Sequence, residues 1–228
     1  MTSSSKNYKT GKIRIDNLAK ILEAAEIEFA LSGYKGASIM SIAKRAKLPR
    51  PNIHYYFPSK LELYNRVLMD VLALWNEAFD RITADDDPAD AIGAYIYAKV
   101  MYSKTNPLAS KIFANELIHG AAHLTEYLNQ DYREWLMGKA EVMQSWINQG
   151  KMDPVDPFYL ILLIWSSTQH YADFSVQVTT VLGKQELADE DYEGIAANLQ
   201  HIILKGCGIK FEQSLIGAKP YAAITKPT

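Results

Sequence analysis

The sequence lacks most of the features that mark secreted, disulfide-linked or membrane-spanning proteins. Its 228 residues include a single cysteine, Cys207, which excludes an intrachain disulfide framework and fits a reducing compartment. The longest apolar candidate, around residues 159–165, is far shorter than the roughly 18 residues that a membrane-spanning helix needs. The N-terminal stretch MTSSSKNYKTGK has no apolar core of a signal peptide. We therefore expect a cytoplasmic protein with no membrane partner.

Catalytic motifs are also missing. The chain contains no GxSxG, no glycine-rich phosphate loop and no constellation of paired acids. The closest approach to a site is two pairs that contain histidine: His170 with Asp173, three residues apart, and His119 with His123, whose four-residue spacing can serve a metal. Gly120 weakens the helical geometry of the second pair, and no cysteine or carboxylate cluster completes it. We expect a protein without catalytic residues, metal or cofactor.

The charges are unevenly distributed. Residues 1–66 hold twelve Lys and Arg but five Asp and Glu, a formal charge of +7, whereas the rest of the chain carries −9. A basic end on an acidic body is typical of a small module that meets a polyanion, attached to a module that does not. The alternative is a solvated charge mosaic, which does not explain why the acids collect in the last two-thirds of the chain.

The chain reads as helices throughout. Apolar residues recur at three- and four-residue spacing, no alternating pair of strands appears, and there is no internal repeat. We therefore predict an all-α fold. The expected helices span about 12–31, 38–46, 48–57, 60–83, 88–104, 107–119, 121–150, 155–182 and 189–206.

Residues 39–63, IMSIAKRAKLPRPNIHYYFPSKLEL, predict a short helix, a tight turn and a second short helix. Ser38 suits the N-cap of the first helix, and Pro49 and Pro51 suit the first turn of the second. Phe57-Pro58 ends that helix, and Ser59 with Glu62 predicts a capping box for the next. The arrangement is a helix-turn-helix, in which the second helix enters the DNA major groove.

These motifs resemble the TetR family of transcriptional regulators, most strongly over residues 20–63. The similarity is carried by Phe29, Gly33, the pair Ile42-Ala43 and the run from Tyr55 to Lys60. The resemblance implies an all-helical dimer with a three-helix DNA-binding head and a larger body that binds a ligand. We expect a flexible basic arm over 1–12, the helix-turn-helix domain over 13–59, the effector-binding and dimerisation domain over 60–210 and a loose tail over 211–228.

The sequence departs from the family pattern at the turn. Lys47 stands where relatives often have glycine, and Pro49-Arg50-Pro51 stands where Ser-Lys-Thr is common. The departure leaves the helix-turn-helix intact but makes the operator sequence unpredictable.

The second helix of the pair supplies the expected base contacts. Arg50, Asn52 and His54 project from it; arginine prefers guanine edges and asparagine adenine edges, which makes Arg50 and Asn52 the best base readers. The resemblance places phosphate contacts at Ser38, Tyr55 and Lys60, while Lys44 and the arm residues Lys9, Lys12 and Arg14 add salt-sensitive attraction. The alternative for each is a solvated surface residue. Core positions of the head are expected at Ile39, Ile42, Ala43, Ile53 and Phe57.

Residues 164–174, IWSSTQHYADF, resemble the pyrimidine-responsive repressors of this family. One face of their helix carries Trp165, Thr168 and Gln169 among apolar residues. A buried amide needs partners, and a planar ligand with adjacent C=O and N–H groups, such as uracil or thymine, pairs with both ends of an amide. Trp75 and Trp165 are expected to sandwich the ring or donate from their indole N–H groups.

Phe79 and Phe113 are expected as apolar walls of the same effector site. Spacing alone favours a core glutamine bonded to backbone beside two packing tryptophans, and it is the resemblance that favours a ligand instead. A family member that responds to a larger, more apolar effector is the other alternative.

The opposite face of this helix is expected to form a homodimer interface with the last helix, through Leu163, Ser167, His170, Phe174 and Gln177. A dimer places two recognition helices in successive major grooves, so we expect a double-stranded operator that is an imperfect palindrome. The expected function is a ligand-responsive regulator, a repressor, that controls pyrimidine or nitrogen metabolism.

Overall fold

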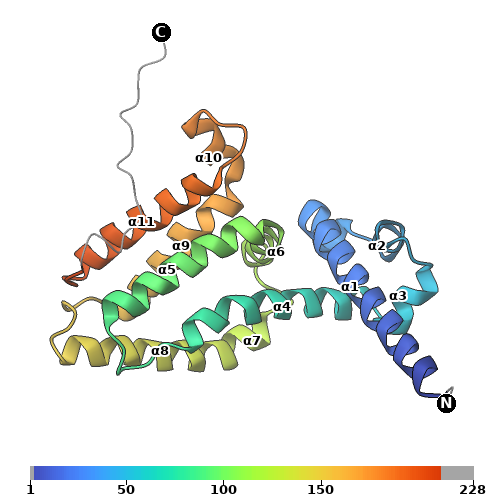
Figure 1. The fold of residues 1–228 in the computed structure, drawn as a ribbon, viewed down its shortest axis with the longest axis horizontal. Helices are drawn as coiled ribbons and strands as arrows, with labels where there is room; N and C mark the ends of the chain where they lie inside the picture. The colour runs from blue at the N-terminus through green and yellow to red at the C-terminus, as the bar shows by residue number, and fades with distance from the viewer. Residues whose placement is uncertain (1–2, 212–228) are drawn as a thin grey trace, which may run out of the picture. The chain divides into compact units, whose positions relative to one another are not determined.

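The computed structural model describes the backbone of residues 3–211 and the side chains of residues 12–211. Within this part the chain is all helical and has no strand, which confirms the predicted fold class (Figure 1). The expected tail beyond residue 211 lies outside the described residues. The helices are α1 (Ser3–Gly36), α2 (Ile39–Ala46), α3 (Arg50–Tyr56), α4 (Lys60–Asp80), α5 (Pro88–Thr105), α6 (Pro107–Ile118), α7 (Thr125–Asn129), α8 (Asp131–Asn148), α9 (Pro157–Asp173), α10 (Ser175–Leu182) and α11 (Asp189–Gly206).

The described chain forms two compact units. The first, which we call the head unit, comprises residues 3–74 and 108–124; the second, the body unit, comprises residues 75–107 and 125–211. The division between these units falls within α4, between residues 74 and 75, whereas the sequence predicted a boundary at residue 60. Most of α4, together with α6 and the turn that follows it, belongs with the helix-turn-helix. A buried carboxylate on α6 bonds to α4 within this unit, as described below, and that contact is what sequence spacing does not reveal.

The helix-turn-helix forms for the local reasons that the sequence indicates. The Ser38 hydroxyl accepts a hydrogen bond of 3.0 Å from the Ser41 N–H, and the Ser41 hydroxyl returns a bond of 2.8 Å to the Ser38 carbonyl. Lys47 ends α2 in the left-handed region, at φ 54°, which explains why a glycine suits this position. The Ser59 hydroxyl accepts from the Glu62 N–H at 3.1 Å, the predicted cap of α4.

The buried core of the head unit confirms most of the expected positions. Ile42, Ala43, Ile53 and Phe57 are buried, whereas Ile39 is only half-buried. The Tyr56 hydroxyl donates to the carbonyl of Arg14 at 3.1 Å and so ties α3 to α1. The core therefore holds the recognition helix by its apolar side and leaves its other side outward.

Three predicted element boundaries are wrong. The first helix extends back to Ser3, so residues 3–12 are helical rather than a flexible arm; one glycine, Gly11, weakens a helix by only about 1 kcal/mol. The expected helix 121–150 is two helices that meet at Gln130 (φ −114°, ψ −87°). The expected helix 155–182 breaks at Phe174 (φ −113°, ψ 33°), where no glycine or proline announces an end.

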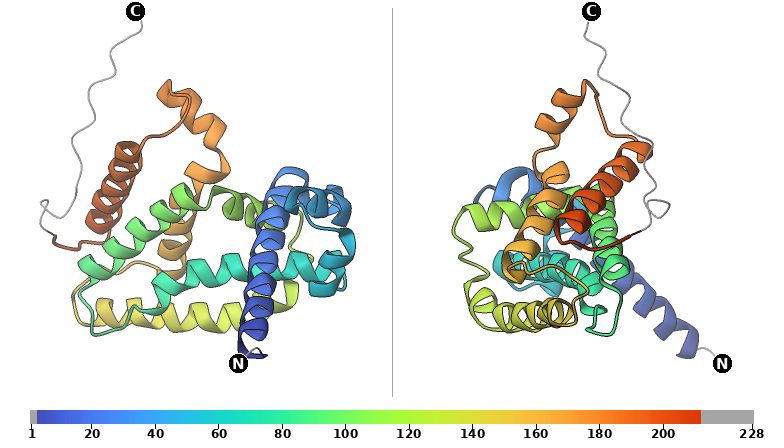
Figure 2. Two further views of the ribbon diagram at one scale, coloured as in Figure 1. Left: turned by 45° about the vertical axis from the view of Figure 1, so that its right-hand side comes forward. Right: turned by 90° about the vertical axis from the view of Figure 1, so that its left-hand side faces the viewer.

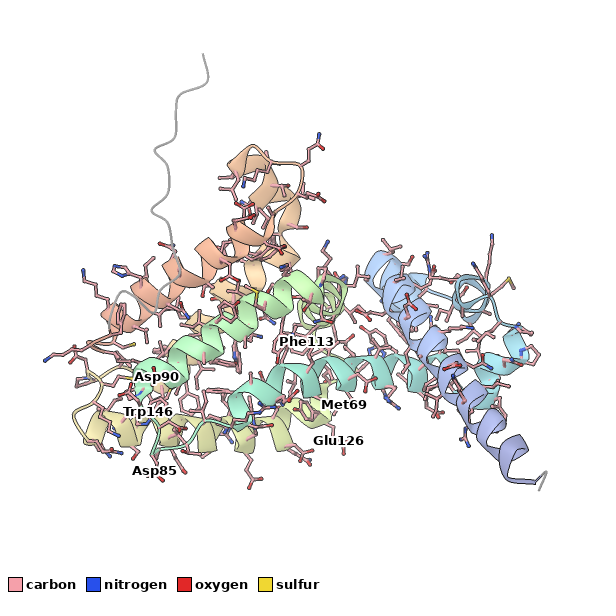
Figure 3. The ribbon with its side chains drawn as sticks, in the orientation of Figure 1. Met69, Asp85, Asp90, Phe113, Glu126 and Trp146 are labelled. Atoms are coloured by element: carbon pink, nitrogen blue, oxygen red, sulfur yellow. The ribbon has the colours of Figure 1, made fainter. Side chains whose placement is uncertain are left out.

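In the body unit, α5 packs against both α9 and α11, and α9 also contacts α8, α10 and α11 (Figure 2). Apolar side chains from these helices form one core that includes Ile96, Ile161 and Trp146, which Figure 3 labels on α8. Asp87 and Asp156 cap α5 and α9, with a proline in each first turn. Helix α9 carries three of the six candidate effector residues: Trp165, Thr168 and Gln169.

None of the described helices is long and apolar enough to cross a membrane.

Candidate DNA-binding and effector sites

The outward side of α3 presents the predicted base readers. Arg50 and His54 are exposed, and the Arg50 Nε–H donates to His54 Nε2 at 3.4 Å, one helical turn away. Tyr55 is 71% exposed, and Asn52 is half-buried. An arginine, an asparagine and a tyrosine on one exposed helix suit contacts with base edges and phosphates, so the predicted roles remain predictions consistent with this placement.

Two predicted phosphate contacts already have structural roles. The Lys60 ammonium donates to the carbonyls of Tyr34 and Ala37, at 2.7 and 3.0 Å, and lies 4.4 Å from the centre of the Tyr34 ring. It thereby closes the end of α1 and retains one N–H for a phosphate. The Ser38 hydroxyl is exposed but engaged in capping α2. Lys44, Lys12 and Arg14 are exposed, and the side chain of Lys9 lies outside the described residues.

A buried carboxylate organises the other end of the head unit. Glu116 on α6 is 5% exposed. Its Oε2 accepts a hydrogen bond of 2.9 Å from the Tyr64 hydroxyl, and its Oε1 accepts one of 2.7 Å from the backbone N–H of His123. The imidazole Nδ1 of His123 lies 3.1 Å from Oε1. Burial works to raise the pKa of Glu116, but the hydrogen bonds from His123 and Tyr64 outweigh it and hold that pKa below its usual value.

Aromatic rings surround this carboxylate. His123 lies 4.3 Å from Tyr34 and 5.2 Å from Tyr64, and Tyr64 packs edge-on against Phe29 at 4.8 Å. The same Tyr34 lies under the Lys60 ammonium. His123 is paired with Glu116, and His119 bonds through Nδ1 to the Asn115 carbonyl at 2.7 Å, so each histidine has a partner within the protein. Within the described residues no group of three ligand-type side chains gathers for a metal.

The body unit contains a chain of aromatic contacts around the predicted effector residues. Phe79 stacks on Tyr95 at 4.3 Å and meets Trp135 edge-on at 5.6 Å. Tyr132 then stacks on Trp135 at 5.5 Å and lies 5.8 Å from Trp165. Phe79 and Tyr95 are buried, whereas Tyr132, Trp135 and Trp165 are half-buried. Aromatic side chains with a few polar groups are a common lining of small-molecule sites.

Helices α5 and α9 face each other through two cross-links in this unit. Near one end the Trp165 indole N–H donates to the Tyr95 hydroxyl at 2.6 Å; near the other the Ser103 hydroxyl donates to the Thr168 carbonyl at 2.8 Å. Lys99 lies one turn from both Tyr95 and Ser103 on α5. The cross-links therefore bracket Lys99.

Lys99 is 2% exposed, and its Nζ lies 4.3 Å from the centre of the Trp75 ring. Among the described residues its ammonium donates no hydrogen bond. Burial lowers the pKa of Lys99 to about 7, and the nearby charge of Asp173 opposes part of that shift. Sequence reasoning missed this lysine. The available signal was a lone lysine on the apolar face of the helix, three, four and seven residues after Ile96, Tyr95 and Ile92.

The structure places the other predicted effector residues in different surroundings. Gln169 is half-buried, and its amide forms no hydrogen bond within the described part of the chain. The Trp165 indole, expected to donate to a ligand, donates to Tyr95 instead, and the Thr168 hydroxyl bonds within its own helix to the Ile164 carbonyl at 2.7 Å. Phe79 lies in the aromatic chain. Phe113 is buried in the head unit (Figure 3), so its role as an apolar wall stays a prediction.

The other face of α9 carries exposed apolar side chains. Leu163 and Phe174 are 52% and 54% exposed, and His170 stacks on Phe174 at 5.0 Å. Sequence reasoning missed two neighbours on this face, Tyr159 and Leu162, which are 75% and 53% exposed. Ser167 is half-buried, with its hydroxyl bonded to the Leu163 carbonyl, and Gln177 is exposed on α10. An apolar surface of this kind suits burial against another chain.

Comparison with known protein families accounts for nearly the whole of this architecture. Residues 21–67 match the model of bacterial regulatory proteins of the tetR family, and residues 68–210 match that of the YcdC-like protein, C-terminal region. The chain belongs to the TetR family of DNA-binding transcriptional regulators. Members of this family bind DNA and small-molecule effectors and form dimers; they are regulators rather than enzymes.

One relative covers most of the chain. The HTH-type transcriptional regulator RutR of Escherichia coli (strain K12) is 37% identical over 186 residues, which are 82% of this chain and 88% of RutR. The HTH-type transcriptional repressor NicS of Pseudomonas putida is 32% identical over 110 residues, 48% of this chain and 52% of NicS.

Solved structures agree in fold alone. The hemolysin II transcriptional regulator HlyIIR superposes with a TM-score of 0.62 at 24% identity, covering 86% of this chain and 99% of HlyIIR. The ketosteroid transcriptional regulator KstR2 of Mycobacterium tuberculosis gives 0.64 at 16% identity, covering 85% of this chain and 95% of KstR2.

Proposed function

We propose that this TetR-family regulator is a repressor whose affinity for its operator is lowered by a small planar effector, uracil or thymine. It would act in the cytoplasm on genes of pyrimidine or nitrogen metabolism. The proposal is supported by the resemblance of residues 164–174 to pyrimidine-responsive repressors and by the 37% identity to RutR.

The observation that carries the proposal is the Gln169 amide. It is half-buried on α9, one turn from Trp165, and lacks a hydrogen-bonding partner among the described residues. A half-buried amide that bonds to no described residue is free to pair with a ligand. An amide offers one donor and one acceptor side by side, the complement of the C=O and N–H groups of a pyrimidine-dione.

The proposed response follows from differential binding. Trp75 is part of α4, and the same helix begins at Lys60, directly after the helix-turn-helix. An effector that contacts Trp75 and favours one disposition of α4 lowers DNA affinity by the ratio of its affinities for the two dispositions, and by no more. In a homodimer formed through the exposed face of α9, the disposition of α4 sets the spacing of two recognition helices on an imperfect palindrome.

The test begins with selection of bound DNA from a random pool, which supplies the operator. Binding of the purified protein to that operator is then measured by gel shift with and without uracil or thymine. The salt concentration is held constant, because phosphate contacts make DNA affinity salt-dependent. We expect the effector to weaken binding to the operator. Unchanged affinity at saturating uracil and thymine would remove the proposal.

A single variant separates the effector site from the DNA site. Gln169→Ala is expected to abolish the uracil response and to leave operator affinity within about twofold, because Gln169 lies in the body unit. Gln144→Ala, an exposed glutamine on α8, is the matched control and keeps the full response. Loss of both DNA binding and the response in Gln169→Ala would identify a structural glutamine.

The second candidate is a regulator with a more apolar effector. The aromatic chain of Phe79, Tyr95, Trp135, Tyr132 and Trp165 favours it, since aromatic rings also line apolar pockets. A thermal-shift screen of nucleobases against hydrophobic compounds separates the two. Stabilisation by hydrophobic compounds alone would favour the second candidate.

A further inference from the structure

The inference concerns the buried ammonium of Lys99 and rests on the proposed function. A buried polar group is normally paired, and an unpaired buried charge is among the least favourable arrangements in a protein interior. Lys99 is 2% exposed, and the described residues give its ammonium the face of Trp75, at 4.3 Å, and the charge of Asp173. Because no hydrogen bond from this ammonium to a described residue is present, its N–H groups are available to a ligand.

The surrounding contacts show that this is not a general failure of pairing. The polar groups one turn to either side of Lys99 are satisfied: the Tyr95 hydroxyl accepts from Trp165, and the Ser103 hydroxyl donates to the Thr168 carbonyl. The neighbouring lysine on the same helix, Lys104, forms an ion pair with Asp189 at 2.9 Å. The Trp146 indole N–H in the same core also lacks a partner, so unpaired polar groups are few in this unit but are not confined to Lys99.

A second unpartnered group faces the same helix pair. Gln169 follows Thr168, the residue whose carbonyl holds Ser103, and its amide also lacks a partner in the described chain. Lys99 lies between the two cross-links on α5, and Gln169 directly follows the second cross-link on α9, with Trp75 of α4 against the ammonium. A lysine supplies donors only, whereas an amide supplies a donor and an acceptor.

We propose that Lys99 recognises a carbonyl oxygen of the effector, so that the ligand carries a C=O and N–H pair for Gln169 and a second oxygen for the ammonium. Uracil and thymine have this pattern in one flat ring. A hydrogen bond from a charged donor in a site that excludes water is stronger than one between neutral groups. The same lysine discriminates against hydrocarbon ligands, which would leave it unpaired.

The test uses the full-length protein and isothermal titration with uracil. Lys99→Met keeps the length of the side chain and removes every donor, and we expect it to weaken uracil binding about ten- to hundredfold. Lys104→Met is the matched control on α5 and is expected to bind uracil within about twofold of wild type. Near-ultraviolet circular dichroism verifies that each variant is folded. Lys99→Gln, which restores an uncharged donor, is the second variant, with an intermediate affinity.

Two uracil analogues locate the contact. The two pyrimidinones each lack one of the carbonyl oxygens of uracil. For one of them, wild type and Lys99→Met are expected to bind with equal affinity, because the contacted oxygen is gone. If Lys99→Met weakens the binding of uracil and of both pyrimidinones by the same factor, Lys99 contacts neither oxygen and the inference is overturned.

The failures are distinguishable. If wild type binds uracil and Lys99→Met binds it equally well, the role of Lys99 is overturned and the proposed effector stands. If folded wild type binds neither uracil, thymine nor the pyrimidinones, the proposed effector is overturned and the inference falls with it.

Discussion

The two units of the protein treat a buried charge in opposite ways. In the head unit, the Glu116 carboxylate receives hydrogen bonds from Tyr64 and His123, and its pKa lies below the ordinary value. In the body unit, the Lys99 ammonium has the face of an indole and no acceptor among the described residues, and its pKa falls to about 7. A charge paired within the protein holds a structure together. A charge left unpaired in an apolar interior weakens the structure and is available to a ligand.

The largest expected effect is the pH dependence of folding that Lys99 causes. Its pKa in the folded protein, about 7, lies below the ordinary 10.5, so the unfolded chain binds more protons between these values. The free energy of unfolding should therefore rise as the pH rises from 7 towards 10.5. The destabilisation is fully present below pH 7 and amounts to at most about 5 kcal/mol.

The measurement is urea unfolding of wild type and Lys99→Met across this pH range, without effector. Groups such as Cys207 and the tyrosines titrate in both proteins and cancel in the difference. Lys99→Met is expected to be the more stable protein at pH 7 and to lose that advantage as the pH rises. A difference that does not change with pH would show that Lys99 is not a buried charge.

The next largest effect is in the head unit, where replacing the buried charge is expected to lower the stability instead of raising it. Glu116→Leu keeps the volume but leaves the Tyr64 hydroxyl and the His123 N–H without an acceptor, so we expect a loss of roughly 3 kcal/mol. Glu126→Leu, at an exposed position on α7 (Figure 3), is the control and should change stability by no more than about 0.5 kcal/mol.

Urea unfolding at pH 7 gives both values. Because the pKa of Glu116 is lowered in the folded protein, its contribution is present above pH 4.5 and is lost as the pH falls through the folded value. A loss in Glu116→Leu no larger than in the control would contradict the structural role of the carboxylate.

The smallest effect tests the turn of the helix-turn-helix. Lys47 is exposed and left-handed at φ 54°, a conformation that glycine adopts without strain. Lys47→Gly is expected to raise the free energy of unfolding by about 0.5–1 kcal/mol, and Lys47→Ala, which retains the strain, is expected to give no gain. Thermal unfolding measures the shift; equal behaviour of the two variants would place the strain elsewhere.

Much of the architecture was predictable because it depends on neighbours in sequence. The Ser38 cap, the capping role of Ser59, the apolar face of Ile42 and Ile53 and the proline starts of α5 and α9 follow from spacing of a few residues. The breaks at Gln130 and Phe174 were not predictable in this way. No local breaker marks them, and packing against other helices decides where such a helix ends.

The sequence by itself determined the class of this protein: an all-helical TetR-family regulator with a basic helix-turn-helix at one end and an aromatic, glutamine-bearing helix in the body. Only the tertiary structure decided which charges are paired. The contacts of Glu116 with Tyr64 and of Lys99 with Trp75 join residues 52 and 24 positions apart in the sequence. The free energy of a buried charge is set by what surrounds it in space.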